Sequence, residues 1–127
     1  MEETLIAFLL ADSGIAAIIG KEATWAERKQ GGAFPALVLH RISGNRDYNM
    51  QGPSGLVQSR IQADCWALKY ADAIKLSRAV RLALSGYQAG NIQGAFIDSE
   101  RQSVEQETNG AQRYFRVSLD FMIWHAE

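Results

Sequence analysis

The sequence of 127 residues predicts an α+β fold, in which helices pack on one face of a mostly antiparallel sheet of four to five strands. Two observations lead to this class. Four segments alternate apolar and polar residues with a period of two, as half-buried strands do. Other segments, near the start and in the middle of the chain, carry apolar residues at helical spacing. The predicted order is helix, short helix, two strands, helix, two strands, in a single domain over residues 1–127.

The first twenty residues predict two helices. Glu2 and Glu3 precede an apolar run, at the place where acidic side chains complement the helix dipole. Asp12 or Ser13 then caps a second, short helix, which Gly20 ends in a left-handed conformation. The acidic start does not fit a signal peptide, and the apolar run is too short to span a bilayer. We therefore expect a soluble cytoplasmic protein with no membrane partner.

Two strands are predicted after an irregular stretch over residues 21–35, which holds at most a short edge strand at Thr24–Ala26. Ala36–Ser43 is a largely buried strand, and Leu56–Trp66 alternates along its whole length. One face of the second strand holds the core candidates Val57, Ser59, Ile61, Ala63 and Cys65. The other face holds Leu56, Gln58, Arg60, Gln62, Asp64 and Trp66.

The second half of the chain predicts a helix and two more strands. Residues 69–86 carry an apolar stripe of Ala73, Leu76, Ala79, Val80, Ala83 and Leu84, and Gly86 ends the helix. Asn91–Glu107 is a weaker strand with Ile92, Phe96 and Ile97 as core candidates. Tyr114–His125 is the clearest strand, with Phe115, Val117, Leu119, Phe121 and Ile123 on its apolar face.

Composition excludes several functional classes. With 47% hydrophobic and 21% charged residues, the chain can bury a core and is not disordered. A net charge of −1 encodes no broad attraction to DNA or to an anionic membrane. The one cysteine, Cys65, cannot form an internal disulfide, which fits a reducing compartment.

No catalytic motif is present. The glycines between the first two long strands lack the Gly-Lys-Ser/Thr ending of a phosphate loop, and "GPSG" does not have the spacing of a nucleophile elbow. Cys65, His40 and His125 offer no ligand spacing for a metal, and no cofactor is expected. We therefore do not expect an enzyme. A small enzyme or ligand-binding module that uses Cys65 and His40 is the alternative from another class.

The segment between the first two long strands is the best candidate for an interaction site. Residues 45–55 form a polar bridge that is longer and more decorated than a hairpin turn needs. Arginine, tyrosine and methionine, which are common at protein interfaces, all occur in it. Two tryptophans lie opposite the apolar rows of their strands, where a partner or the helices would cover them. The candidate contact residues are Arg46, Asp47, Tyr48, Asn49, Met50, Gln51, Trp66 and Trp124.

Several of these stretches, in this order, resemble the tail-completion proteins of long-tailed bacteriophages and gene transfer agents, a family that includes tail terminators and tail-to-head joining proteins. The resemblance covers almost the whole chain, from "MEETLIAFLLADSGIAAIIG" to "RYFRVSLDFMIWHAE". Its most specific part is "PALVLHRIS", followed by "DYNMQGPSGL", "RIQADCWA" and the helix that begins "KYADA".

The resemblance implies a structural protein of the virion, assembled in the host cytoplasm, without catalytic residues. Such proteins form a ring, typically a hexamer, that caps the tail tube and meets a head-side connector protein. DNA passes through the channel of the ring without specific binding. A head-side connector or stopper ring remains the alternative within this class. Ser99–Gln112 is a candidate second docking loop.

Overall fold

The computed structural model describes residues 2–26, 34–50, 52–88, 92–106 and 113–126. The predicted α+β class and the predicted order of elements are both confirmed. Along the chain the elements are α1 (Glu2–Ala11), α2 (Ser13–Ile19), β1 (Ala23–Trp25), β2 (Ala36–Asn49), β3 (Gly52–Ala67), α3 (Tyr70–Leu84), β4 (Ile92–Gln106) and β5 (Arg113–Ala126).

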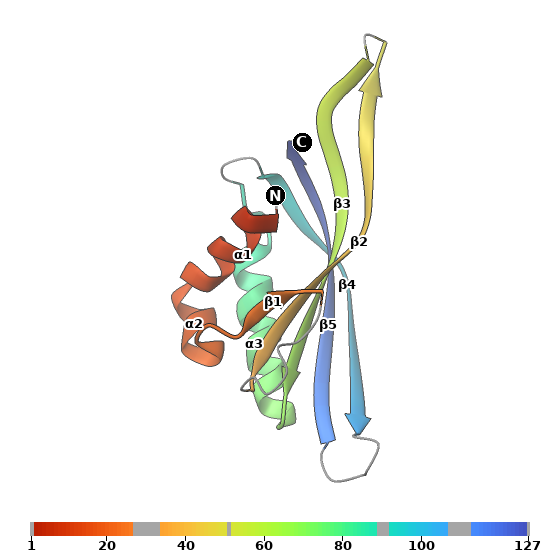
Figure 1. Cartoon of the computed structure of the whole chain (residues 1–127). Coiled ribbons are helices and arrows are strands. Elements are labelled where there is room, and N and C mark those ends of the chain that lie inside the picture. Colours follow the sequence, from red (N-terminus) through yellow and green to blue (C-terminus); the bar gives the residue numbers. More distant parts are fainter. Residues whose placement is uncertain (1, 27–33, 51, 89–91, 107–112, 127) are drawn as a thin grey trace.

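The five strands form one sheet in the order β1-β2-β3-β5-β4. Only the short β1 runs parallel to its neighbour, and the β2–β3, β3–β5 and β5–β4 pairs are antiparallel. All three helices lie on the same face of the sheet, and no helix of the described residues lies on the opposite face (Figure 1). We call these the helix face and the open face. The β2–β3 and β4–β5 hairpins project at opposite ends of the sheet (Figure 1).

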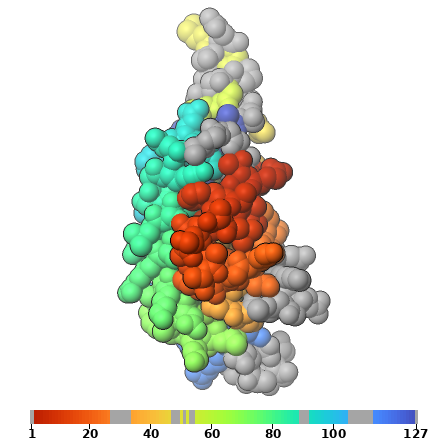
Figure 2. All heavy atoms as spheres, turned by 90° about the vertical axis from the view of Figure 1, so that its left-hand side faces the viewer, coloured from red at the N-terminus to blue at the C-terminus, as the bar shows by residue number. Residues whose placement is uncertain are grey.

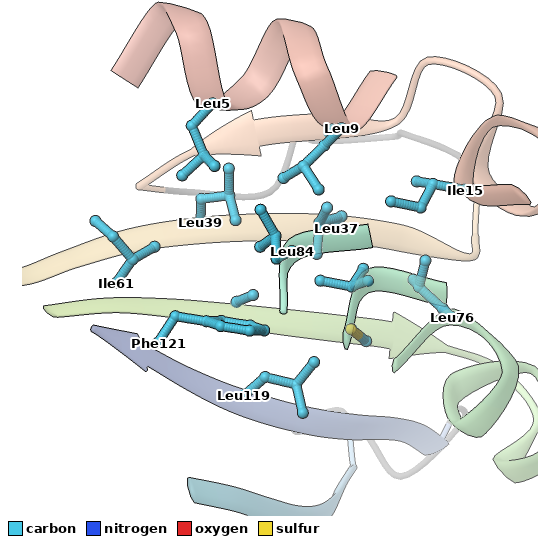
Figure 3. Packing of buried hydrophobic residues seen from close by; sticks show 14 of the residues in the cluster. Leu5, Leu9, Ile15, Leu37, Leu39, Ile61, Leu76, Leu84, Leu119 and Phe121 are labelled. Carbon is cyan, nitrogen blue, oxygen red and sulfur yellow. The ribbon is translucent and has the colours of Figure 1, made fainter. Parts of the chain in front are cut away.

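The core lies between the helices and the helix face. Leu5 and Leu9 of α1 point toward Leu37 and Leu39 of β2, while Phe121 of β5 lies flat against the sheet beneath them (Figure 3). Period-two alternation predicted the buried face of two strands correctly. The fully or almost fully buried residues include Val57, Ser59, Ile61, Ala63 and Cys65 of β3 and Val117, Leu119, Phe121 and Ile123 of β5.

Strand β4 corrects two of the predicted core residues. Ile92 is buried, but Phe96 is 55% exposed and Ile97 is 36% exposed. Phe96 pairs with Met122, in the row of Arg60, and therefore lies on the open face. Ile97 faces the helix side, but β4 lies at the sheet margin, where a groove of about 340 Å³ lies between α3 and β4. The helix layer thus covers β4 at Ile92 and Ala95 but leaves Ile97 partly exposed.

The polar bridge between the first two long strands is itself mostly strand. β2 continues to Asn49 and β3 begins at Gly52, so β2 extends past the predicted end at Ser43 and β3 begins before the predicted start at Leu56. Residues 44–55 lack apolar alternation because no core lies beside most of them. The short edge strand was predicted at Thr24–Ala26 and lies at Ala23–Trp25, and Ala26 has a φ of 73°.

The caps of the N-terminal helices follow the predicted pattern. The Asp12 side chain accepts a hydrogen bond of 3.0 Å from the backbone N–H of Ile15, so Asp12, and not Ser13, is the N-cap of α2. Gly20 ends α2 with a φ of 63°. No helix within the described residues is both long enough and apolar enough to cross a membrane.

We expect Asp12→Ala to lower the free energy of unfolding by about 1 kcal/mol, because the backbone donors of α2 lose their cap. Ser13→Ala is the matched control and should change stability by less than about 0.5 kcal/mol. Urea unfolding followed by circular dichroism measures both. Equal losses in the two variants would contradict the assignment of the cap.

Candidate assembly surface

The outer end of the β2–β3 hairpin forms a two-stranded arm. Strand β5 pairs with β3 only as far as Leu56, and Tyr48 and Asn49 pair with Pro53 and Gly52 beyond that row. We define the arm as residues 47–55. In Figure 2 the described part of the arm stands above the helix layer, clear of the body of the molecule. A ribbon of two strands without a third strand or a helix is marginally stable in water, so such an arm gains stability when a partner covers it.

A β-bulge joins the arm to the sheet. The register shifts between Arg46 and Tyr48, so β3 carries more residues than β2 over this interval. Gly55 lies in the shifted interval with a φ of 83°, a backbone conformation that side chains with a Cβ rarely adopt. Because bulges bend and twist a ribbon, this one sets the direction in which the arm leaves the sheet.

The structure places the predicted arm contacts as follows. Arg46 lies at the base of the arm, is exposed, and pairs with Val57 across the hairpin. Asp47, Tyr48 and Asn49 form the last residues of β2, and the structure describes their backbone only. Met50 lies in the turn and is fully exposed. Gln51 lies outside the described residues.

The two predicted tryptophans lie on the open face, so neither packs under the helices. Trp66 pairs with Arg116, is partly buried, and has the guanidinium of Arg116 5.2 Å from its ring centroid. Trp124 is also partly buried and pairs with Gln58, near the base of the arm. Eight residues of β5 separate the rows of the two tryptophans, which is about 27 Å along a strand. They therefore belong to different ends of the open face.

Between the tryptophan rows the open face carries a connected set of polar side chains from four strands, which sequence reasoning missed. We call it the open-face network: His40, Arg60, Gln62, Asp64, Asp98, Ser99, Arg101, Ser118 and Asp120. The alternation predicted correctly that Asp64 points away from the core, and Asp120 lies on the same open face, in the row of Gln62. Both are nevertheless buried, with 2% and 6% of their surface exposed. The sequence signal was the row of polar residues on this face of β3 and β5.

Asp64 is one of two carboxylates in the network that each contact three other side chains. Its Oδ1 accepts hydrogen bonds from Ser118 Oγ at 2.7 Å and from Gln62 Nε2 at 2.9 Å. Its Oδ2 lies 3.2 Å from His40 Nε2. These contacts join β2, β3 and β5 across the open face. A buried carboxylate needs such partners, because an unpaired charge away from water is costly.

Asp120 of β5 contacts side chains of both β3 and β4. Its Oδ2 accepts from Ser99 Oγ at 3.0 Å and lies 3.5 Å from an Arg60 nitrogen, while its Oδ1 lies 3.5 Å from Arg101. Arg60 also donates to Asp98, and this hydrogen bond raises the pKa of Arg60 above its ordinary value. Arg60 and Arg101 are therefore already paired with carboxylates, which weakens any role of this face as a basic stripe for nucleic acid.

Cys65 and His40 do not form a catalytic pair. Cys65 is in the row of Leu37 on the helix face, whereas His40 is in the row of Gln62 on the open face. Burial, with the charges of Asp64 and Glu100, raises the pKa of the Cys65 thiol far above its ordinary value. A neutral, buried thiol is a poor nucleophile. The geometry that the alternative enzyme hypothesis required is absent.

A buried hydroxyl–imidazole contact lies at the arm end of the core. Ser59 Oγ is 2.7 Å from His125 Nε2, and His125 Nδ1 is 2.9 Å from the backbone oxygen of Ala126. Because a carbonyl only accepts, Nδ1 donates to it, and Nε2 shares a hydrogen bond with the serine hydroxyl. Both side chains are buried, with Ser59 fully enclosed. The contact satisfies two polar groups in the core and gives no substrate access to the serine.

The described residues hold no group of three or more His, Cys, Asp or Glu side chains that could bind a metal ion. The structure offers several surfaces for contact with other proteins: the arm, the open face with a tryptophan near each end, and long strand edges.

Comparison with known proteins agrees with a role in assembly. A search among curated proteins finds no significant match. Among solved structures the chain is similar to a chain in the virion of a native gene transfer agent particle, with a TM-score of 0.60 and 19% sequence identity. The similarity covers 95% of this chain and 90% of that one, and it shows a shared fold. The family model for tail completion protein gp17 matches residues 3–126. The chain therefore belongs to the tail completion protein gp17 family of virion structural proteins.

Proposed function

We propose that the chain is the subunit of a ring, typically of six copies, that caps the tail tube and joins the tail to a head-side connector protein. The observation that carries this proposal is the arm, which extends beyond the sheet and ends in the fully exposed Met50. Large apolar side chains at such a position favour burial against another protein. The rest of the domain is a packed two-layer body that holds the arm in place.

A ring subunit needs two different surfaces that contact its two neighbours, because a head-to-tail contact closes only by rotation. It also needs a third surface for the tube or the head. The open face and the two sheet margins provide separate surfaces for these tasks. Near-neutral net charge and paired arginines suit a channel through which DNA passes without being held.

Deletion of the outer part of the arm tests the proposed function. We expect that deletion of Met50–Ser54 leaves the domain folded, because Met50 is fully exposed and the pairing of β5 with β3 begins only at Leu56. Tails should then fail to join heads or should vary in length, as electron microscopy of particles from complemented cells will measure. Joined tails of normal, fixed length with the deleted protein would contradict the role of the arm.

A matched pair of substitutions separates the arm from general surface effects. Met50→Asp and Leu82→Asp each place a carboxylate on an exposed apolar position, the first in the arm and the second on α3. We expect Met50→Asp to reduce the yield of joined particles and Leu82→Asp to leave it unchanged. Equal loss of particles in both variants would show that the arm has no special part.

A head-side connector or stopper ring remains the runner-up within this class. The two are distinguished by the protein that the arm touches. A photo-crosslinking residue at position 50 should capture the tail tube protein in a terminator and a head protein in a connector.

The buried position of Cys65 also generates a prediction against the enzyme hypothesis. Since burial raises the pKa of the thiol, little reactive thiolate exists even at mildly alkaline pH. We expect a thiol reagent to label the native protein many times more slowly than the urea-unfolded protein. Rapid labelling of the native protein, followed by mass spectrometry, would contradict the assignment of Cys65 to the core.

A further inference from the structure

Within the described residues, the sheet has a strand edge without a neighbouring strand at each of its two margins, one on β2 and one on β4. β1 pairs with β2 only over Leu37–Leu39, and no strand within the described part of the chain lies beside β2 from residue 40 onward on that side. At the other margin β4 pairs with β5 along one side only, over the whole of Ile92–Gln106. Exposed strand edges of this length are normally shortened, charged or covered, because their backbone groups pair with other chains.

The two free edges run in opposite directions. β3 is antiparallel to β2, β5 to β3, and β4 to β5, so β4 is antiparallel to β2. Rotation about an axis along the strands preserves the direction of every strand. In a ring built by such rotations, β4 of one subunit meets β2 of the next in an antiparallel arrangement, which gives the stronger ladder.

Exposed apolar residues lie at the same height on both edges. One row of the sheet runs from Ser43 through Arg60 and Met122 to Phe96, and the next runs from Arg41 to Ile97. Ile42 lies between these rows on β2 and is 54% exposed, while Phe96 is 55% exposed. Rotation about the strand direction keeps heights unchanged, so Ile42 of one subunit faces Phe96 and Ile97 of its neighbour.

The charges of the two edges are complementary. Over residues 40–45 the β2 edge holds Arg41 and no acidic residue, whereas residues 92–100 of β4 hold Asp98 and Glu100 and no cation. Arg41 and Asp98 also have partners within the subunit, in Glu2 and Arg60. Pairing of β4 with a second β4 would bring like charges together, which is destabilising across strands. The charges therefore favour the mixed pair.

We infer that a second copy of this chain docks edge to edge, with its β2 edge from residue 40 onward paired antiparallel to β4, and with Ser43 opposite the Phe96 region. Sheets of successive subunits then join into one continuous wall. This inference deepens the proposed ring, on which it rests, by naming the surfaces that close it.

Cysteine crosslinking tests this arrangement. Ser43→Cys is made in one set of subunits, and Gln93→Cys, Phe96→Cys or Ser99→Cys in another; all four positions are exposed. Three strand spacings of about 4.8 Å separate β2 from β4 within one chain, which exceeds the reach of a disulfide, so any crosslink joins two subunits. The native Cys65 is buried and does not interfere.

We expect mixed assemblies of Ser43→Cys with at least one β4 variant to give a disulfide-linked dimer that neither variant gives alone. The dimer is measured by non-reducing electrophoresis, both on self-associated purified protein and on protein from completed tails. Dimers from Phe96→Cys alone would overturn the inference in favour of β4–β4 pairing.

The outcomes separate this inference from the function on which it rests. Completed tails that give no mixed crosslink at any of the three positions overturn the edge pairing and leave the proposed function standing. Mixed crosslinks in a protein whose gene does not restore tail completion support the edge pairing and overturn the function. If no mixed crosslink forms and the gene does not restore tail completion, both the edge pairing and the proposed function are overturned.

Discussion

The structure depends on the burial of one face of a long sheet beneath a much shorter layer of helices. α3 has 15 residues, about 22 Å at helical rise, whereas β3 has 16 residues, about 54 Å at strand rise. The helices can therefore cover only the middle of the strands. The apolar rows of Figure 3 occupy this covered part, and the strands continue beyond it at both ends. The arm and the second hairpin are direct results of this difference in length.

On the open face, which no helix of the described residues covers, contacts between strands come from polar side chains. On that side, side chains that bridge from one strand to the next add to the backbone hydrogen bonds of the sheet. Asp64 and Asp120 act as the two centres of these bridges, and together they connect β2, β3, β5 and β4. Because a buried carboxylate such as Asp64 is accommodated only when its donors are in place, the polar face also favours one register of the strands over its neighbours.

Sequence reasoning found the class, the order of elements and most of the core, because these follow from local periodicity. The alternation in Phe115–Ile123 predicts which face of β5 is buried, because a core lies beside these residues. The failures lie where the core ends. Phe96 has the hydrophobicity of a core residue but lies in an edge strand on the open face, and a single sequence does not show which strand is at the edge.

The candidate assembly surface was also predicted only in part, because the periodicity of the sequence is informative only where a core lies beside a strand. The composition of residues 45–55 marked the arm, and opposition to the apolar rows put Trp66 and Trp124 on the correct face. The continuation of both strands into the arm was missed, since a strand without a core beside it shows no apolar alternation. The open-face network was also missed, because it joins residues from four strands whose adjacency depends on the order β2-β3-β5-β4. That order is a tertiary property.

The three-residue strand β1 has a consequence for the geometry of the proposed ring. It occupies the margin of β2 over Leu37–Leu39 and runs parallel to it, so a strand from a neighbouring subunit cannot pair with β2 over these residues. In the proposed ring, β1 would confine the edge pairing to β2 from residue 40 onward, so that a shift of one subunit along the axis changes how much of the pair can form. A stack of subunits held at one height closes into a flat ring, whereas subunits free to slip would climb into an open spiral.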